Sequence, residues 1–122
     1  MIAQDEIERC IPWIEDALAY NGQGVTLDDV LDGLQLSMYK LWAQDDGCCV
    51  TELKELPNGC IVNIFLGAGS MSAIEKCVIS IEAYAKCIGA KKIVMFGRRG
   101  WERSFLRDRG FKSPWTLMVK EI

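Results

Sequence analysis

The chain has 122 residues, of which 50% are hydrophobic and 25% charged, and its formal net charge is −3. This composition is typical of a globular protein and excludes a disordered chain, and the length predicts one domain spanning 1–122. The sequence has no apolar run of the roughly 18 residues that a membrane span needs, and its acidic start lacks the pattern of a secretory signal. We therefore expect a cytoplasmic protein without a membrane partner.

Charge is distributed unevenly along the chain. Residues 1–90 carry 5 basic and 14 acidic side chains, a net −9, whereas residues 91–122 carry 9 basic and 3 acidic ones, a net +6. Such asymmetry indicates an anionic ligand, a nucleic acid or an acidic partner near the C-terminal elements, or internal complementarity between the two parts. A pI near 5.0 disfavours nucleic acid.

Six cysteines and no histidine limit the chemistry. The missing histidine excludes every His-based catalytic triad, and without a CxxC pair we expect no metal site. We interpret the cysteines as small buried hydrophobic residues in the reduced state.

Helical periodicity dominates the first 35 residues. Apolar side chains recur at helical spacing over 7–18, and Pro12 indicates either a helix start near Ile11 or a kink. Thr26 followed by Asp29 resembles a capping box and predicts the start of a second helix.

The pattern then changes to short apolar runs separated by Asp-Asp-Gly and Pro-Asn-Gly turns. These runs predict strands over Met38–Gln44, Cys48–Leu56 and Cys60–Leu66. Asn-Gly between apolar runs is a strong hairpin signal, so we expect a three-stranded antiparallel meander.

A Gly-Ala-Gly-Ser turn is predicted at 67–70, before a long helix from about Ser72 to Ile88 that ends at Gly89. Backbone N–H groups at a strand-to-helix turn can hold a phosphate. Alternatively, the small residues only allow the strand and helix to pack closely.

The C-terminal third predicts a buried strand over Ile93–Phe96 and a short helix over Trp101–Arg109. Phe111 starts a predicted final strand with an apolar face formed by Trp115, Leu117 and Val119. Strands that alternate with helices predict an α/β domain with crossover connections.

This order of elements resembles the GNAT superfamily of acyl-CoA N-acyltransferases. The resemblance covers most of the chain from about Ala3 and is best over residues 83–111, AYAKCIGAKKIVMFGRRGWERSFLRDRGF, where Arg109-Gly110-Phe111 matches the family's helix-end Gly-Phe pattern. It implies an α+β fold, with a mixed, mostly antiparallel sheet flanked by helices.

The resemblance also implies a function, direct transfer of an acyl group from acetyl-CoA to an amine. In the family, amides of the turn after the fourth strand bind the CoA pyrophosphate, and acyl-CoA and an amine acceptor are the partners. It places the following residues near the cofactor: Leu66, Gly67, Ala68, Gly69, Ser70, Met71, Ser72, Arg98 and Arg99.

Two positions depart from the family pattern. Ile64 stands where the turn motif has Arg or Gln, and Leu106 stands where a Tyr serves as general acid. Glu52 is the candidate for the base that deprotonates the amine, or it belongs to a solvent-facing row with Lys54 and Leu56. Whether the chain is an enzyme therefore stays open.

The alternative function is a non-catalytic structural or interaction protein with the GNAT-like fold. Small GNAT-like proteins with eroded motifs occur in tailed-phage genomes, some of them as internal virion proteins, and this chain resembles them in size and in the loss of motifs. A phage origin would place the chain in a virion, and a homodimer or another protein partner fits this alternative. A third alternative is a nucleic-acid accessory that uses the stripe of Arg99, Arg103 and Arg107. A transferase predicts an open cleft between the strands ending at Leu66 and Phe96, with free amides at Gly69–Ser72. An interaction protein predicts that side chains such as Met71 or Trp101 close this cleft, with an apolar patch elsewhere.

Overall fold

A computed structural model describes residues 4–20, 24–98, 100–114 and 117–122. Its elements, in chain order, are α1 (Gln4–Tyr20), α2 (Leu27–Gln35), β1 (Tyr39–Gln44), β2 (Gly47–Leu56), β3 (Gly59–Gly69), α3 (Met71–Cys87), β4 (Lys92–Met95), the 3-10 helix η1 (Trp101–Arg103) and α4 (Phe105–Asp108). The four strands form one sheet in the order β1-β2-β3-β4. The first three are antiparallel neighbours and β4 runs parallel to β3. The predicted meander and mixed sheet are confirmed.

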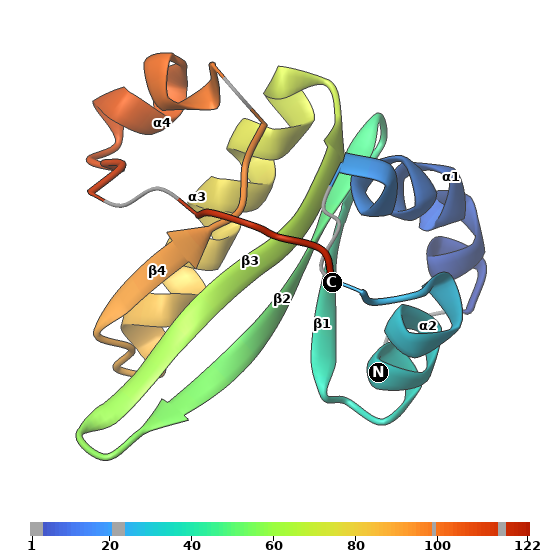
Figure 1. Cartoon of the computed structure of the whole chain (residues 1–122), viewed down its shortest axis with the longest axis horizontal. Helices are drawn as coiled ribbons and strands as arrows, with labels where there is room; N and C mark the ends of the chain where they lie inside the picture. The colour runs from blue at the N-terminus through green and yellow to red at the C-terminus, as the bar shows by residue number, and fades with distance from the viewer. Residues whose placement is uncertain (1–3, 21–23, 99, 115–116) are drawn as a thin grey trace.

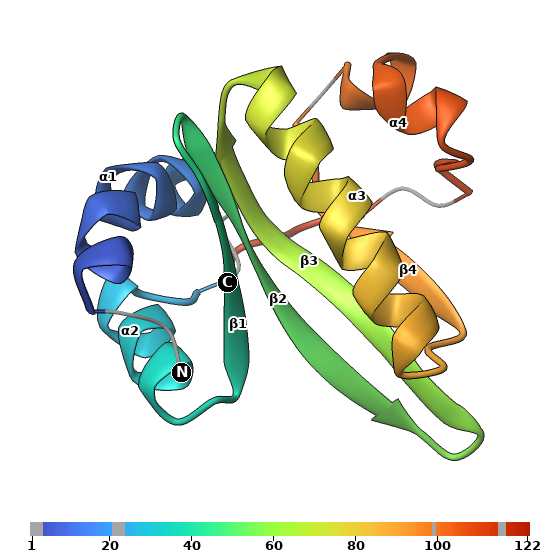
Figure 2. The same ribbon diagram turned by 180° about the vertical axis from the view of Figure 1, so that it is seen from behind.

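Helices cover both faces of this sheet. Figures 1 and 2 show α1 and α2 against one face and α3 against the other. The first face buries a cluster that includes Ile14 and Phe65, and the second face buries Ile64, Ile74 and Ile81. Among the helices in the described ranges, none is both long and apolar enough to cross a lipid bilayer.

Helix α1 contradicts the predicted start near Ile11, because Pro12 lies inside a continuous helix that begins at Gln4. Proline cannot donate the hydrogen bond to the carbonyl four residues earlier, which belongs to Glu8. Both Pro12 and Glu8 are exposed, so water can satisfy that carbonyl. The helix buries Ile7 and Ile14, as its periodicity predicts.

The capping box that starts α2 is confirmed. The Asp29 N–H donates to Thr26 Oγ1 at 3.2 Å, and the Thr26 N–H donates to Asp29 Oδ2 at 3.0 Å. An aspartate therefore replaces the usual Glu or Gln without loss of the reciprocal pair.

The predicted turn at 67–70 is wrong. Strand β3 continues through Gly69, and Ser70 is the single residue before α3 begins at Met71. The extra strand residues pair with the start of β2, with Gly69 opposite Gly47 and Gly67 opposite Cys49. The sequence suggests a turn because glycine favours turns, but these glycines are needed for close packing between backbones.

The C-terminal third is less regular than predicted. Ser104 separates η1 from α4, and β4 is half-buried rather than buried because it lies at the edge of the sheet. The predicted final strand is absent from residues 111–114 and 117–122, and Trp115 lies outside the described residues. Figures 1 and 2 show the last residues crossing the sheet on the face opposite α3.

Candidate functional site

A bulge in β3 opens the sheet between β3 and β4. Val50 of β2 faces Leu66, whereas the next residue, Thr51, faces Ile64, so Phe65 is an extra residue in β3. Pairing with β4 ends at the same place, where the Phe96 N–H donates to the Ile64 carbonyl at 3.1 Å. Since a bulge bends its strand and increases the local twist, the two strands separate beyond Ile64.

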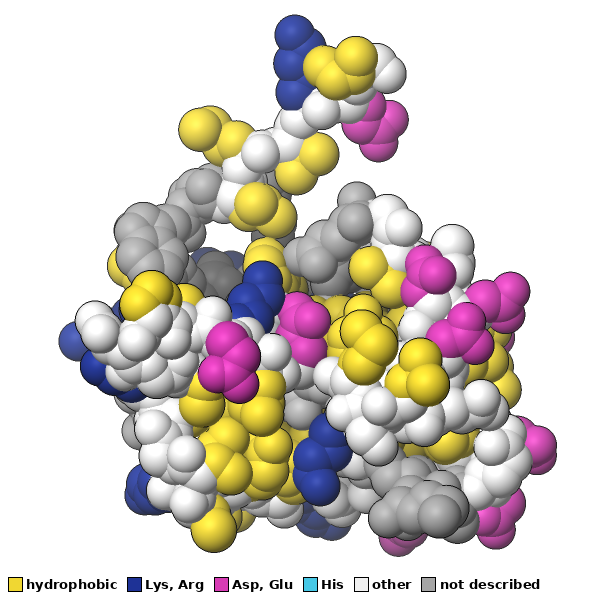
Figure 3. Space-filling view, turned by 90° about the horizontal axis from the view of Figure 1, so that it is seen from below, with side chains coloured by type: hydrophobic (Ala, Val, Ile, Leu, Met, Phe, Trp, Pro, Cys, Tyr) yellow, Lys and Arg dark blue, Asp and Glu magenta, His cyan; other side chains and the backbone are white. Residues whose placement is uncertain are grey.

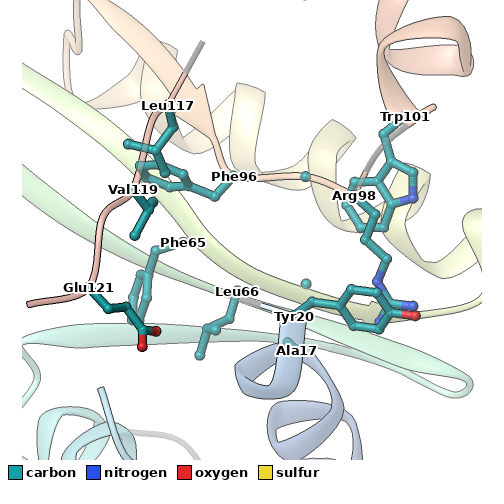
Figure 4. Close-up of a pocket in the computed structure, with 12 residues that line it drawn as sticks. Ala17, Tyr20, Phe65, Leu66, Phe96, Arg98, Trp101, Leu117, Val119 and Glu121 are labelled. Atoms are coloured by element: carbon teal, nitrogen blue, oxygen red, sulfur yellow. The ribbon is translucent and has the colours of Figure 1, made fainter. Parts of the chain in front are cut away.

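The separation leaves a cleft of about 290 Å³. Figure 4 shows its lining side chains gathered around one hollow, from α1, β3, the loop after β4 and the C-terminal segment. The lining residues are Ala17, Tyr20, Phe65, Leu66, Gly67, Phe96, Gly97, Arg98, Trp101, Leu117, Val119 and Glu121. A cleft between the strands predicted to end at Leu66 and Phe96 is therefore present, as the transferase interpretation predicts.

Trp101 fills part of the separation. A Cβ on Gly97 would lie 2.7 Å from Trp101 Cε3, and a Cβ on Gly67 would lie 3.9 Å from Trp101 Cη2. The indole thus spans from the loop after β4 to β3, and it packs with the cluster under α3. Trp101 therefore closes the cleft in part, as predicted for an interaction protein. The hollow that remains lies on the α1 side of the sheet.

Arg98 closes one side of the cleft instead of presenting a free cation. Its Nη2 donates to Asp16 Oδ2 of α1 at 2.6 Å, and its guanidinium carbon lies 4.0 Å from the centre of the Tyr20 ring. Its Nε is buried and has no partner among the described residues. Arg98 therefore ties the loop after β4 to α1.

The start of α3 holds a carboxylate of the protein itself. Ser70 Oγ accepts from the Ala73 N–H at 3.0 Å and donates to Asp46 Oδ2 at 2.5 Å. The Ser70 N–H donates to the Asp46 carbonyl at 3.0 Å, so the prediction of free amides over Gly69–Ser72 is wrong at Ser70. Asp46 thus supplies the negative charge that the positive end of a helix favours.

The predicted cofactor residues divide between these two places. Leu66, Gly67 and Arg98 line the cleft, whereas Ala68, Gly69, Ser70, Met71 and Ser72 do not. Arg99 lies outside the described residues. Tyr20, Phe65 and Glu121 line the cleft but carry no motif, and only the three-dimensional fold brings them together.

Glu52 lies on β2, on the sheet face that α1 and α2 cover, and does not line the cleft. Its Oε1 accepts from Asn63 Nδ2 at 2.9 Å and lies 4.0 Å from Lys54 Nζ. Its pairing partner Tyr39 contacts the Phe65 ring, with ring centres 4.8 Å apart. Glu52 is therefore one aromatic side chain removed from the cleft wall.

The six cysteines are free and four of them are buried. A hydrogen bond to Cys10 and burial raise the pKa of the Cys48 thiol, and a hydrogen bond to Cys77 and burial raise the pKa of the Cys49 thiol. The same two hydrogen bonds lower the pKa of their partners, Cys10 and Cys77. The protonated, buried thiols of Cys48 and Cys49 are poor nucleophiles. Within the described ranges, no three His, Cys, Asp or Glu side chains are placed to hold a metal ion.

Solved structures match nearly the whole chain, whereas no protein-family model and no curated protein sequence matches it. A probable acetyltransferase aligns with a TM-score of 0.72 and 9% identity, over 99% of this chain and 97% of its own. The ribosomal-protein-alanine N-acetyltransferase of Brucella melitensis biovar Abortus 2308 aligns with a TM-score of 0.58 and 18% identity, over 93% and 94%. The chain has the GNAT acetyltransferase fold.

A transcriptional regulator from Bacillus halodurans C-125 also aligns, with a TM-score of 0.73 and 12% identity over 99% of this chain and 96% of its own. Identities this low describe the fold alone. Structures described as acetyltransferases and as a transcriptional regulator therefore share this fold. Because a fold does not fix a function, the function has to be argued from the cleft.

Proposed function

We propose that the chain binds an acyl thioester in the β3–β4 cleft and transfers the acyl group directly to an amine. The observation that carries this proposal is the cleft itself, opened by the bulge at Phe65 within the GNAT fold. Acetyl-CoA is the donor that the fold suggests. The acceptor amine would enter from the α1 side, where the hollow is open.

The size of the cleft limits what it can hold. A volume of about 290 Å³ is at the lower end of small-molecule sites, which span roughly 300–1,000 Å³. It suits the acyl and pantetheine portion of the donor, and its aromatic walls at Phe65, Phe96 and Trp101 suit an apolar chain. The described β3–β4 pairs end at Ile64, and Leu66 and Gly67 line the cleft just beyond them. A backbone N–H of one of these two residues is the proposed group that polarises the thioester carbonyl.

The reaction moves one proton and exchanges one bond. The amine nitrogen forms a C–N bond with the thioester carbon, the C–S bond breaks, and the amine loses a proton while the thiolate gains one. Glu52, oriented by Asn63, is the proposed base and would act through a water molecule because it lies behind the cleft wall. No tyrosine stands at the position of the family's acid, since Leu106 is buried there.

The test is ligand-induced stabilisation followed by an activity screen. Acetyl-CoA or acetyl-pantetheine at about 100 times its dissociation constant should add about 2.7 kcal/mol of stability, several degrees in Tm. Phe96→Ala in the cleft should abolish the shift, and Ile79→Ala is the matched control, because Ile79 is similarly exposed on α3 outside the cleft. If neither thioester shifts Tm at millimolar concentration, the transferase proposal fails.

Glu52→Gln then tests the base. We expect it to keep the Tm shift and to lower the rate of acyl transfer by about 100-fold, in the range typical of general-base catalysis. A rate unchanged from wild type across the pH range would remove Glu52 from the mechanism while leaving thioester binding intact.

The second candidate is a non-catalytic protein with the same fold. Asp46 at the start of α3 favours it, because this carboxylate repels a pyrophosphate where the family binds one. Trp101 in the separation favours it as well. This candidate predicts no thioester-dependent change in Tm.

A further inference from the structure

The last described residues form an extended C-terminal arm, residues 117–122, with two different rows of side chains. Leu117, Val119 and Glu121 line the chain's own cleft (Figure 4). Successive side chains of an extended segment point to opposite sides. The second row therefore faces away from the cleft, and it consists of Met118, Lys120 and Ile122.

The whole arm is exposed to solvent, and the outer row is the more exposed of the two. Met118 and Ile122 are 87% and 112% exposed, against 65% and 73% for Leu117 and Val119 of the inner row, and Lys120 is exposed as well. Figure 3 shows an arm that stands clear of the rest of the molecule and carries apolar and charged side chains at its tip. An exposed apolar–basic–apolar row indicates a surface that another molecule covers.

A second hollow lies between α2 and β1, separated from the cleft by the Tyr39–Phe65 aromatic pair. This α2–β1 groove measures about 310 Å³ and is lined by Val25, Asp29, Asp32, Gly33, Leu36, Met38 and Tyr39. Leu36 and Met38 are 70% and 62% exposed, so the groove floor is apolar and open. Its rim carries two exposed carboxylates, and hydrogen bonds from Thr26 lower the pKa of Asp29 and keep that group ionised.

We propose that the outer row of the C-terminal arm docks in the α2–β1 groove of a second copy of this chain. Met118 and Ile122 would cover Leu36 and Met38, and Lys120 would face the rim. The same complementarity holds for the whole chain, since residues 91–122 carry +6 and residues 1–90 carry −9. Each copy offers one arm and one groove, so reciprocal docking closes a two-fold dimer. This inference does not depend on the proposed acyl transfer.

Sedimentation velocity of the full chain tests the proposal by charge reversal. Wild type should sediment as a dimer at high micromolar concentration. Lys120→Glu and Asp32→Lys should each weaken the dimer about fivefold, as expected for loss and reversal of an exposed pair. The double variant should restore it, because the reversed charges attract again. Both side chains are exposed, so the fold should tolerate the changes, which circular dichroism checks.

Glu121→Lys is the matched control, because Glu121 is the adjacent residue on the inner row. It should leave the dimer at wild-type strength. A monomer at every concentration overturns the proposal, and so does a double variant no stronger than the single ones. A loss in Glu121→Lys as large as in Lys120→Glu also overturns it, because the two rows would then be equivalent.

Discussion

Two places at the end of β3 resemble ligand sites, and they differ in how the chain fills them. At the start of α3, Ser70 and Asp46 satisfy each other, and Gly69 packs against the backbone of the β1–β2 turn. Between β3 and β4, the bulge at Phe65 leaves a hollow that side chains only partly fill. The chain therefore keeps an open cleft between β3 and β4, while its own carboxylate occupies the start of α3.

The largest expected loss of stability comes from Gly69, which we expect to be needed for close packing rather than for ligand binding. Its φ of +113° disfavours any side chain, and a Cβ would lie 2.3 Å from the Asp46 carbonyl oxygen and from Gly47 Cα. Gly69→Ala should therefore lower the free energy of unfolding by about 3 kcal/mol or more. Chemical denaturation measures this loss.

Gly110→Ala is the control for Gly69. Gly110 has a similar φ of +89°, but nothing lies within 4 Å of its Cβ position, so only the backbone cost of about 1–2 kcal/mol applies. Equal losses in the two variants would show that close packing at the start of α3 does not matter.

Trp101 forms part of the cleft wall, and we expect it also to contribute to the stability of the fold. It is half-buried and packs over Gly97, so Trp101→Ala should lower the free energy of unfolding by about 2 kcal/mol, less than for a fully buried tryptophan. Thermal or urea unfolding checks the value. A loss below experimental error would mean that the indole does not fill the separation in solution.

Asp46→Asn tests whether the carboxylate at the helix start excludes a pyrophosphate. Removing this charge should tighten acetyl-CoA binding about fivefold, the equivalent of about 1 kcal/mol, because the helix end can then accept an anion. Acetyl-pantetheine lacks the pyrophosphate and should bind as before. Calorimetry measures both affinities.

Asp45→Asn is the matched control, because Asp45 carries the same charge in the same turn but does not contact Ser70 in the described residues. An equal gain from both variants would indicate a general charge effect rather than a specific block at the helix start.

The smallest effect concerns the capping box of α2, far from both places. Hydrogen bonds from the Thr26 backbone and side chain lower the pKa of Asp29 below its usual 3.8. A lowered folded-state pKa stabilises the fold above pH 3.8, and this contribution is lost as pH falls through the folded-state value. Wild type should therefore exceed Asp29→Asn in Tm at neutral pH and lose that advantage in acid.

Asp28→Asn serves as its control. Asp28 is exposed in the same first turn but takes no part in the capping box. If the Tm of Asp28→Asn follows the same pH dependence as that of Asp29→Asn, the effect belongs to the helix end in general and not to the reciprocal hydrogen bonds.

The elements whose signals are local could be predicted from the amino-acid sequence alone. The capping box at Thr26, the Asn-Gly hairpin and the periodicity of α3 depend on neighbours a few residues away, and each appears where the pattern predicts it. The resemblance to the GNAT superfamily also predicted the mixed, mostly antiparallel sheet with its flanking helices, and the transferase interpretation predicted the cleft between the strands ending at Leu66 and Phe96.

Contacts between residues that are distant in the sequence could be known only from the tertiary structure. Gly67 and Gly69 belong to a strand because β2 offers them backbone partners, and Pro12 stays inside α1 because solvent can satisfy the Glu8 carbonyl. Asp46 and Ser70, 24 residues apart, meet only when β3 is complete. The cleft wall likewise combines α1 with the loop after β4, because Arg98 reaches Asp16 across 82 residues of sequence. Local patterns cannot specify such contacts, since the free energy that holds them comes from packing elements that are remote in the chain.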